Sequence, residues 1–168
     1  ASVSLIQDES AMGLDPFTVR NLEVFSSLAT QGIHGSLIGV MDKTITASGS
    51  RLLKSWLRRP LTDVKMIRSR LSRVQEFYDR PVLLDSVRLL LREVSDIDRI
   101  LARLATIKAT PRDVVNLGDS LLKLPEIKQV LKKDIPSLNK LISTAVNTEK
   151  IVDKIKIILK EEAPISLQ

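Results

Sequence analysis

Hydrophobic side chains recur at helical spacing along nearly the whole chain. One stripe has its members three and four positions apart and is typical of a seam between two helices: Val64, Ile67, Leu71, Val74 and Tyr78. Between residues 50 and 59, the apolar side chains fall on one arc of a helix and the basic side chains on the opposite arc. No segment alternates with the period of two that a half-buried strand requires. The pattern therefore predicts an all-α chain.

Prolines and capping residues divide this pattern into about nine helices. Asp15 before Pro16, and Thr110 before Pro111, each place a side-chain acceptor ahead of a proline at the first helical position. The other expected boundaries are a first helix that runs to Gly32 and Gly35, a short helix capped by Ser36, a turn over residues 44–49, a helix capped by Asp63, a break at Arg80 and Pro81, a capping box from Ser95 to Asp98, new helices at Pro125 and at Pro136, and a last helix from Thr148 to Pro164. No glycine-rich linker interrupts the chain, so we expect a single domain built as an irregular multi-helix bundle.

Composition narrows the chemistry that this bundle can carry. The chain has 168 residues, of which 43% are hydrophobic, and this proportion provides a buried core. It has no cysteine and one histidine, which excludes disulfides and thiolate metal sites and leaves too few imidazoles for a zinc centre. The net charge of +6 permits contact with nucleic acid, but only 3% of the residues are aromatic, which argues against a platform for stacked bases.

A basic cluster between Arg51 and Arg73 is the strongest compositional feature, because eight Lys or Arg residues there meet a single acid, Asp63. Such a cluster attracts phosphate groups and makes binding dependent on salt. Four of its side chains are candidate contacts to DNA or to a partner protein: Lys54, Arg58, Arg59 and Lys65. The alternative is that the charged faces meet only water or acidic partner surfaces, and the pattern leaves that choice open.

Motifs for catalysis do not occur in the sequence. It contains neither a phosphate-binding Gly-x-x-x-x-Gly-Lys-Ser/Thr loop nor a Gly-x-Gly-x-x-Gly turn. His34 has no evident partner that would make it a base. Asp96 and Asp98, two positions apart on a helix, point in nearly opposite directions and cannot share one ion. We therefore expect no catalytic residue, no metal ligand and no enzymatic activity in this chain.

Several stretches match a known pattern in both order and spacing. They are MGLDPFTVRNLE at residues 12–23, GSL at 35–37, MDKTIT at 41–46, GSRLLKSWL at 49–57, PLTD at 60–63, DIDRILAR at 96–103 and PRD at 111–113. Together they resemble the core domain of the MutS family of DNA mismatch-repair proteins. The departures are small: Ser48 stands where the family usually has Met, Met41 where it has Leu, and Asp98 where it has Glu.

The resemblance implies a place within a larger repair ATPase. The family joins a mismatch-reading domain, a connector, a helical core with lever helices, a DNA clamp and a P-loop ATPase, and this chain is similar to the first part of the core. That implies a lead-in over residues 1–11, the helical core over 12–162, and a tail over 163–168 that leads toward the lever and clamp. The residues that the resemblance marks as architectural are Asp15, Asn21, Glu23, Thr46, Gly49 and Arg51.

Partners follow from the same resemblance. The full-length protein would bind mismatched DNA, ATP and Mg²⁺, whereas the core itself would hold no cofactor. The other MutS domains (connector, clamp and ATPase) would be its neighbours, the full-length protein would be a dimer, and no membrane would be involved. It would be cytoplasmic and associated with the nucleoid in a bacterium, or nuclear in a eukaryote. Two functions stay open: a helical scaffold that couples the ATPase to DNA clamping, and a stand-alone basic helical module that binds nucleic acid through residues 51–73.

Overall fold

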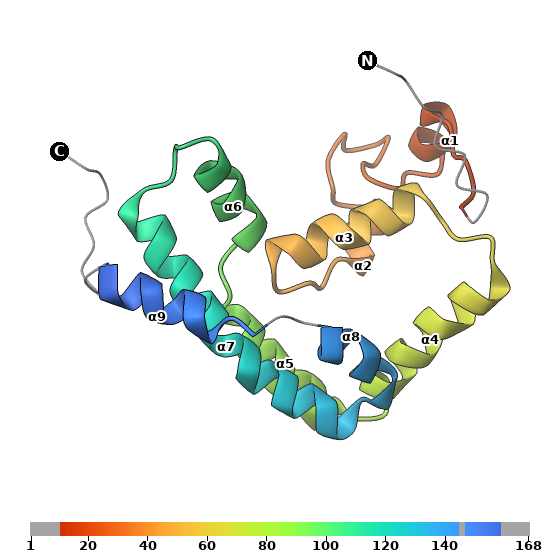
Figure 1. Cartoon of the computed structure of the whole chain (residues 1–168). Coiled ribbons are helices and arrows are strands. Elements are labelled where there is room, and N and C mark those ends of the chain that lie inside the picture. Colours follow the sequence, from red (N-terminus) through yellow and green to blue (C-terminus); the bar gives the residue numbers. More distant parts are fainter. Residues whose placement is uncertain (1–10, 145–146, 159–168) are drawn as a thin grey trace, which may run out of the picture. The chain divides into compact units, whose positions relative to one another are not determined.

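The structure is a computed structural model that describes residues 11–144 and 147–158 (Figure 1). These residues form nine α-helices and one 3-10 helix, with an isolated bridge between Ala11 and Leu61 as the sole extended pairing among them. The expected all-α fold is confirmed. The contacts group the chain into two compact units: unit 1 comprises Ala1–Thr44 and Gly49–Leu71, and unit 2 comprises Ile45–Ser48 and Ser72–Gln168. The expected tail over 163–168, with the stop at Pro164, and all but the last residue of the expected lead-in lie outside the described residues.

Unit 1 begins with a helix that is shorter than its apolar stripe suggests. α1 (Pro16–Asn21) starts at the expected cap, Asp15, but the prediction that it continues to the glycines at 32 and 35 is wrong. The chain leaves the helix because Glu23 adopts a left-handed φ of 49°, which a continuous right-handed helix cannot contain. The apolar residues after Asn21 therefore keep their spacing of three although they lie in a series of turns and not in a helix.

α2 (Leu37–Met41) packs against the turns that follow α1. It begins at the expected cap, Ser36, whose hydroxyl accepts a hydrogen bond from the amide of Gly39 at 3.2 Å. The amide of Ile38 donates to the carbonyl of Val24 at 2.9 Å, and both of these side chains are buried. A Cβ at Gly39 would lie 2.3 Å from a backbone carbonyl oxygen of the preceding turn, so only glycine fits there. A small core around Val24 and Ile38 thus fixes the first part of unit 1.

The segment expected to be a turn over residues 44–49 is partly helical. α3 (Ala47–Arg58) begins inside it, so the turn is confined to the residues before Ala47. The Ser50 hydroxyl donates to the Asp42 carboxylate at 2.7 Å, and the Ser48 hydroxyl donates to the Asp98 carboxylate at 2.8 Å. These tertiary bonds outweigh the weak helix propensity of small and β-branched residues, which is why propensity alone misplaced the start of α3.

α4 (Val64–Tyr78) is capped as expected, because the Asp63 carboxylate accepts the amide of Met66 at 2.8 Å. The apolar seam predicted on this helix is not buried. Ile67 is half-buried, and the other four members of the seam are each more than half exposed. The spacing predicts the helix correctly but says nothing about what covers its apolar stripe.

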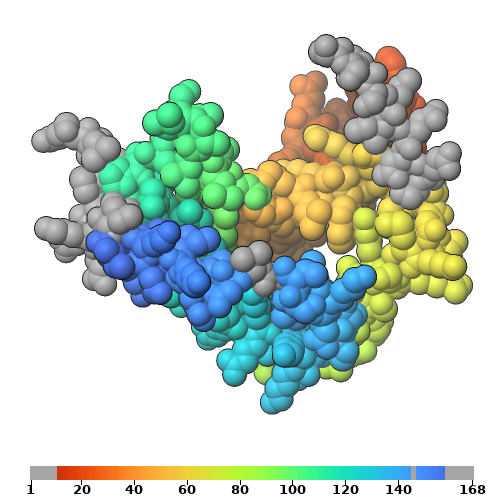
Figure 2. Space-filling view, viewed as in Figure 1, coloured from red at the N-terminus to blue at the C-terminus, as the bar shows by residue number. Residues whose placement is uncertain are grey.

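Unit 2 is built around one long helix, α7 (Pro111–Asp134). The other elements that pack against it are α5 (Pro81–Arg92), α6 (Ile97–Ala105), the 3-10 helix η1 (Pro136–Leu138), α8 (Asn139–Thr144) and α9 (Glu149–Ile158). Figure 2 shows the atoms of α8 and α9, in blue, lying over those of α7. Pro81 and Pro136 start helical segments as predicted. All the described helices of unit 2 after α4 therefore share one central element.

Small residues allow this close packing. Gly118 of α7 is buried, and a Cβ built there would lie 3.1 Å from Cγ2 of Ile155 on α9, so a larger side chain would push α9 away. Ser120, also on α7, is completely buried. Its hydroxyl donates to the carbonyl of Asn116 at 2.7 Å and accepts from the amide of Ser95 at 2.9 Å. A partly buried hydrogen bond thereby holds the segment between α5 and α6 to α7.

Pro125 was expected to start a new helix, and that prediction is wrong, because α7 continues through it. Proline has no amide hydrogen, so the carbonyl of Leu121, four residues earlier, loses its usual partner. Thr148, just before α9, brings its hydroxyl to 3.5 Å from that carbonyl oxygen. Between Leu121 and Pro125, the Lys123 ammonium pairs with the Glu93 carboxylate at 2.5 Å. Tertiary contacts thus support the helix at the point where its own ladder is interrupted.

The start of α6 differs from the expected capping box. The carboxylate of Asp96, rather than the hydroxyl of Ser95, caps the helix, and it accepts the amide of Arg99 at 3.3 Å. Asp98, expected to reach back to the cap, instead accepts the bond from Ser48. The box fails because the amide of Ser95 is already held by Ser120. A residue recruited by tertiary contact is not available for a local cap.

α6 ends in a left-handed residue that is not glycine. Ile107 has a φ of 56°, and its amide donates to the carbonyl of Leu104 at 3.1 Å. The amide of Lys108 donates to the carbonyl of Arg103 at 2.8 Å, so both bonds of a Schellman motif are formed. Glycine is usual at this position, and a β-branched side chain there is strained. The sharp turn from α6 into α7 is therefore imposed by the hydrogen bonds around it.

Replacing Ser120 by Ala should destabilise unit 2 by about 1–3 kcal/mol, because the partly buried amide of Ser95 would lose its acceptor. The matched control is Ser86→Ala, since the exposed Ser86 hydroxyl bonds only to the carbonyl of Val82 in its own helix. Chemical denaturation with circular dichroism measures both variants. Equal effects of the two substitutions would show that the buried bond has no special weight.

Candidate functional site

Three basic side chains of α3 and a fourth just after its end gather around one hollow in unit 1. Arg51, Lys54, Arg58 and Arg59, together with Ser55, line a space of about 330 Å³. Their positions along the helix place them on one side, opposite the apolar arc. Three of the four candidate contacts predicted from the basic cluster are thus brought together, and Arg51, taken as architectural, joins them. Lys65, the fourth candidate, is exposed on α4 and does not line this hollow.

Two arginines of the cluster stack on aromatic rings. Cζ of Arg58 lies 5.0 Å from the centroid of the Phe25 ring, and Cζ of Arg70 lies 3.9 Å from the centroid of the Trp56 ring. Such cation–π contacts hold the guanidinium groups in place, and the aromatic rings pack against them within unit 1. Neither pair could be predicted from the sequence, because the residues of each pair are far apart along the chain and show no periodic relation. Arg58 therefore has a structural contact as well as a place in the hollow.

The architectural residues around α1 hold the backbone. The Asp15 carboxylate accepts the amides of Phe17 at 2.8 Å and Thr18 at 2.9 Å, and the Thr18 hydroxyl at 2.6 Å. These bonds hold the pKa of Asp15 below its ordinary value, and the bond from the Thr18 hydroxyl has the largest effect. Asn21 is the last residue of α1. The Glu23 carboxylate accepts bonds from the Ser27 hydroxyl and the Leu28 amide, and it thereby closes the turn after the helix.

A second carboxylate organises the start of α3, and the sequence analysis missed it. Asp42 accepts the Thr44 hydroxyl at 2.5 Å, the Thr44 amide at 3.1 Å and the Ser50 hydroxyl at 2.7 Å. The Thr44 hydroxyl is the main cause of the lowered pKa of Asp42. Thr46 immediately precedes α3, and Gly49 lies in its first turn. The signal available in the sequence was the Asp-x-Thr spacing of a side-chain turn.

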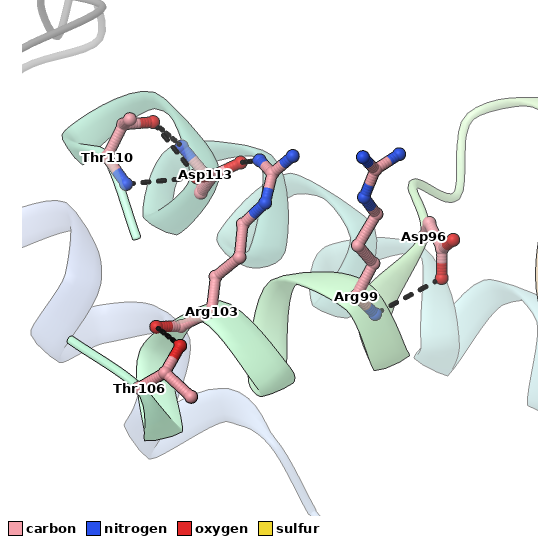
Figure 3. A network of polar contacts seen from close by, with 6 residues as sticks. All are labelled: Asp96, Arg99, Arg103, Thr106, Thr110 and Asp113. Atoms are coloured by element: carbon pink, nitrogen blue, oxygen red, sulfur yellow. Dashed lines mark hydrogen bonds and ion pairs between the residues drawn. The ribbon is translucent and has the colours of Figure 1, made fainter. Parts of the chain in front are cut away.

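A polar network joins α6 to α7 in unit 2 (Figure 3). Arg103 extends from α6, and its Nη1 lies 2.8 Å from Oδ1 of Asp113 in the first turn of α7. The other oxygen of Asp113 accepts the amide of Thr110 at 2.9 Å, while the Thr110 hydroxyl accepts the amide of Asp113 at 3.2 Å. This is a reciprocal capping box, and the cap expected from Thr110 and Pro111 is confirmed. Thr106, at the end of α6, donates its hydroxyl to the carbonyl of Ala102 at 3.0 Å.

The backbone hydrogen bond from Thr110 is the largest cause of the lowered pKa of Asp113, and the positive charge of Arg103 acts in the same direction. Partial burial opposes them, but the net shift favours the ionised carboxylate. The Asp113 carboxylate therefore stabilises both the start of α7 and its contact with α6. Its geometry serves to position α6 against α7, because both oxygens of the carboxylate are already occupied.

The described residues offer no metal centre, since no group of three or more His, Asp or Glu side chains converges among them. His34 is exposed in a turn, where its carbonyl accepts the Thr30 hydroxyl at 2.9 Å. None of the helices in the described ranges is both long enough and apolar enough to cross a bilayer.

Comparison with known proteins gives consistent matches. Residues 17–167 match the family model described as MutS domain III. The chain is 37% identical over 165 residues to the DNA mismatch repair protein MutS of Oceanobacillus iheyensis, which covers 98% of this chain and 19% of that protein. It is 50% identical over 121 residues to the protein of the same name from Symbiobacterium thermophilum, covering 72% of this chain and 14% of that protein. The chain thus spans less than a fifth of the length of these curated relatives.

The Asp113 carboxylate should make the stability of the folded chain depend on pH under acidic conditions. Because its pKa is lower in the folded chain than the ordinary 3.8, its contribution is present above that value and is lost as the pH falls through the folded pKa. We expect Asp113→Asn to lower the melting temperature at pH 7 and to reduce the fall in melting temperature between pH 7 and pH 3. Asp119→Asn, at an exposed position of the same helix, is the control. An unchanged acid-side fall in Asp113→Asn would contradict the assigned role.

Proposed function

The chain belongs to the MutS family, in which it corresponds to domain III, and from this premise we propose that it is the helical scaffold of a DNA mismatch repair ATPase. Its task in the full-length protein is to couple the ATPase to the clamping of DNA. The relatives that cover nearly all of this chain carry the name DNA mismatch repair protein, which supports the assignment to mismatch repair. In this proposal the mismatch, ATP and Mg²⁺ are bound by other domains.

The observation that carries the coupling role is the continuity of α7. This helix has 24 residues, which corresponds to a length of about 36 Å. It continues through Pro125, and each of the helical elements from α5 to α9 packs against it. A helix supported in this way moves as a stiff body, so a displacement at one end is carried to the other. A flexible linker with the same residues could not carry that displacement.

We propose in addition that residues 12–162 form the helical core and that the tail that follows leads toward the lever and clamp. Connector, clamp and ATPase domains are its neighbours in a dimeric protein that acts on DNA, at the nucleoid in a bacterial cell or in the nucleus of a eukaryote. Asp15, Asn21, Glu23, Thr46, Gly49 and Arg51 fix the helix starts and turns that set the orientation of those contacts. Their hydrogen bonds to backbone and hydroxyl groups, where described, support this role.

A second candidate is a basic helical module that binds nucleic acid by itself. The hollow lined by Arg51, Lys54, Arg58 and Arg59 favours it, because four positive side chains at one hollow attract phosphate groups. Lys54→Glu with Arg59→Glu tests this candidate without disturbing the Arg58 stack. If the chain binds duplex DNA through this surface, the pair of substitutions weakens binding and lowers the slope of its salt dependence by about two phosphate contacts. Binding that the pair leaves intact excludes this surface as a DNA site.

Flexibility introduced into α7 should uncouple the full-length protein. Leu122→Gly with Glu126→Gly adds two glycines at exposed positions around Pro125, and each costs about 1 kcal/mol of helix stability. Leu122→Ala with Glu126→Ala is the matched control, because it removes the same side chains and keeps the helix propensity. We expect the glycine pair to reduce mismatch-dependent stimulation of ATP hydrolysis several-fold while hydrolysis without DNA stays near its original rate.

Helical content and melting temperature of both pairs establish that the proteins are folded. If the glycine and alanine pairs retain equal stimulation of ATP hydrolysis, the proposal that α7 transmits the displacement is wrong. If both pairs lose hydrolysis without DNA as well, the helix serves the stability of the whole protein and the coupling role has no support.

A further inference from the structure

One side of α4 carries a row of apolar side chains that we call the α4 seam. Its members are three and four residues apart, and all except the half-buried Ile67 are more than half exposed: Val64, Ile67, Leu71, Val74 and Tyr78. We propose that the α4 seam is the docking site for an α-helix of the full-length protein that lies outside residues 1–168 and has acidic side chains beside its own apolar row. The inference rests on the proposed function only in placing the chain within a longer protein.

The spacing of the α4 seam determines which kind of element fits on it. Steps of three and four residues repeat every seven, so Val64, Leu71 and Tyr78 take the first position of successive heptads, and Ile67 and Val74 take the fourth. Such a row follows the helix axis closely over about 21 Å. A second helix can accompany it over that length, because its side chains enter the spaces between those of the seam. A strand cannot keep this register, since its side chains alternate with a period of two.

Contacts within the chain use other parts of the α4 surface. The Glu76 carboxylate accepts the hydroxyl of Ser137 at 2.9 Å, and Glu76 lies nearly opposite the α4 seam on the helix. Cζ of Arg70, at one edge of the seam, lies 3.9 Å from the centroid of the Trp56 ring. These contacts hold α4 while its apolar row stays exposed. A continuous exposed apolar row of this kind is typical of a surface that another element covers.

The charges beside the α4 seam favour a different helix over a second copy of this one. Arg68 is exposed at the edge opposite to Arg70, so a guanidinium group stands at each edge. Two copies of α4 would bring these cations together, which disfavours self-association. A helix with Glu or Asp beside its apolar row would pair with Arg68 instead. The match to this chain covers 19% of the Oceanobacillus iheyensis protein, so most of such a protein lies outside these residues and includes the sequence for this helix.

Thiol labelling tests whether the α4 seam is covered. The chain has no cysteine, so we compare a single thiol in the seam, Leu71→Cys, with one on the far side of α4, Arg73→Cys, which is equally an exposed position. Reaction with a maleimide, followed at each site by mass spectrometry, is measured in the 168-residue chain and in the full-length protein. We expect Leu71→Cys to react at least about tenfold more slowly in the full-length protein, because a docked helix excludes the reagent. The reaction of Arg73→Cys should change little.

A synthetic helix tests the chemistry of the partner. The probe is a peptide of heptads with Leu at the first and fourth positions and Glu at the flanking positions, and its matched control has Lys in place of Glu. Like charges keep each peptide from pairing with itself. We expect the 168-residue chain to bind the Glu peptide at least about tenfold more tightly than the Lys peptide, with a gain of helical signal in circular dichroism. Arg68→Glu should reduce this preference more than Lys65→Glu, which makes the same charge change farther from the seam.

Three results would overturn the proposal: equal labelling of Leu71→Cys in the two proteins, equal slowing of both thiols in the full-length protein, or equal affinity for the two peptides. Labelling of Leu71→Cys that slows as the 168-residue chain is concentrated, with a dimer in sedimentation, assigns the α4 seam to a second copy and overturns it as well. If Leu71→Cys unfolds the chain, Val74→Cys replaces it, with the same slowing expected. Failure of the glycine pair in α7 to uncouple ATP hydrolysis would leave these results unchanged, because labelling measures what covers α4 and not what α7 transmits.

Discussion

Two small buried residues of α7, Gly118 and Ser120, are the constraint on which unit 2 depends. Gly118 has no side chain, so α9 approaches until Ile155 meets the position that a Cβ of Gly118 would occupy. On the nearly opposite side of the helix, the Ser120 hydroxyl accepts the amide of Ser95. Close packing on one side and a satisfied hydrogen bond on the other thus hold α9 and the segment before α6 to the same helix, because a buried polar group is tolerated only when its partner is held at bonding distance. With α9 held there, Thr148 can approach the carbonyl that Pro125 leaves without an amide partner, and the helix continues.

Charged side chains in this chain divide into two groups by what they contact. Asp15, Asp42 and Asp113 have their oxygens occupied by amides and hydroxyls, so their charges stabilise backbone geometry. Arg58 and Arg70 are stacked on rings. Three lysines of unit 2, Lys128, Lys132 and Lys140, line a hollow together with Glu149. Net charge alone does not separate these roles, since a carboxylate in a cap and a carboxylate in a binding site count equally in a sum.

The apolar stripe of α4 is largely exposed to solvent. Its members have the spacing of a helix–helix seam, yet most of them are exposed, and the chain spans less than a fifth of its curated relatives. A domain that works among neighbours needs apolar surface for them as well as for its own core. Exposure of this kind agrees with the scaffold proposed here, in which relative orientation of helices is the functional property. A self-contained module would be expected to bury more of such a stripe.

Local patterns determined the helical class, most helix starts and the family. Asp15, Ser36, Asp63 and Thr110 cap helices as predicted, because a cap needs only a side chain and the amides two or three residues later. The family was recognisable because its motifs keep their order and spacing along the chain, and the match over residues 17–167 confirms it. Tertiary structure decided where local preference and distant contacts compete: α7 passes through Pro125, α3 starts at Ala47, and Asp96 rather than Ser95 caps α6. The arginine stacks and the lysine-lined hollow also had no trace in the sequence, because their members meet only after the chain has folded.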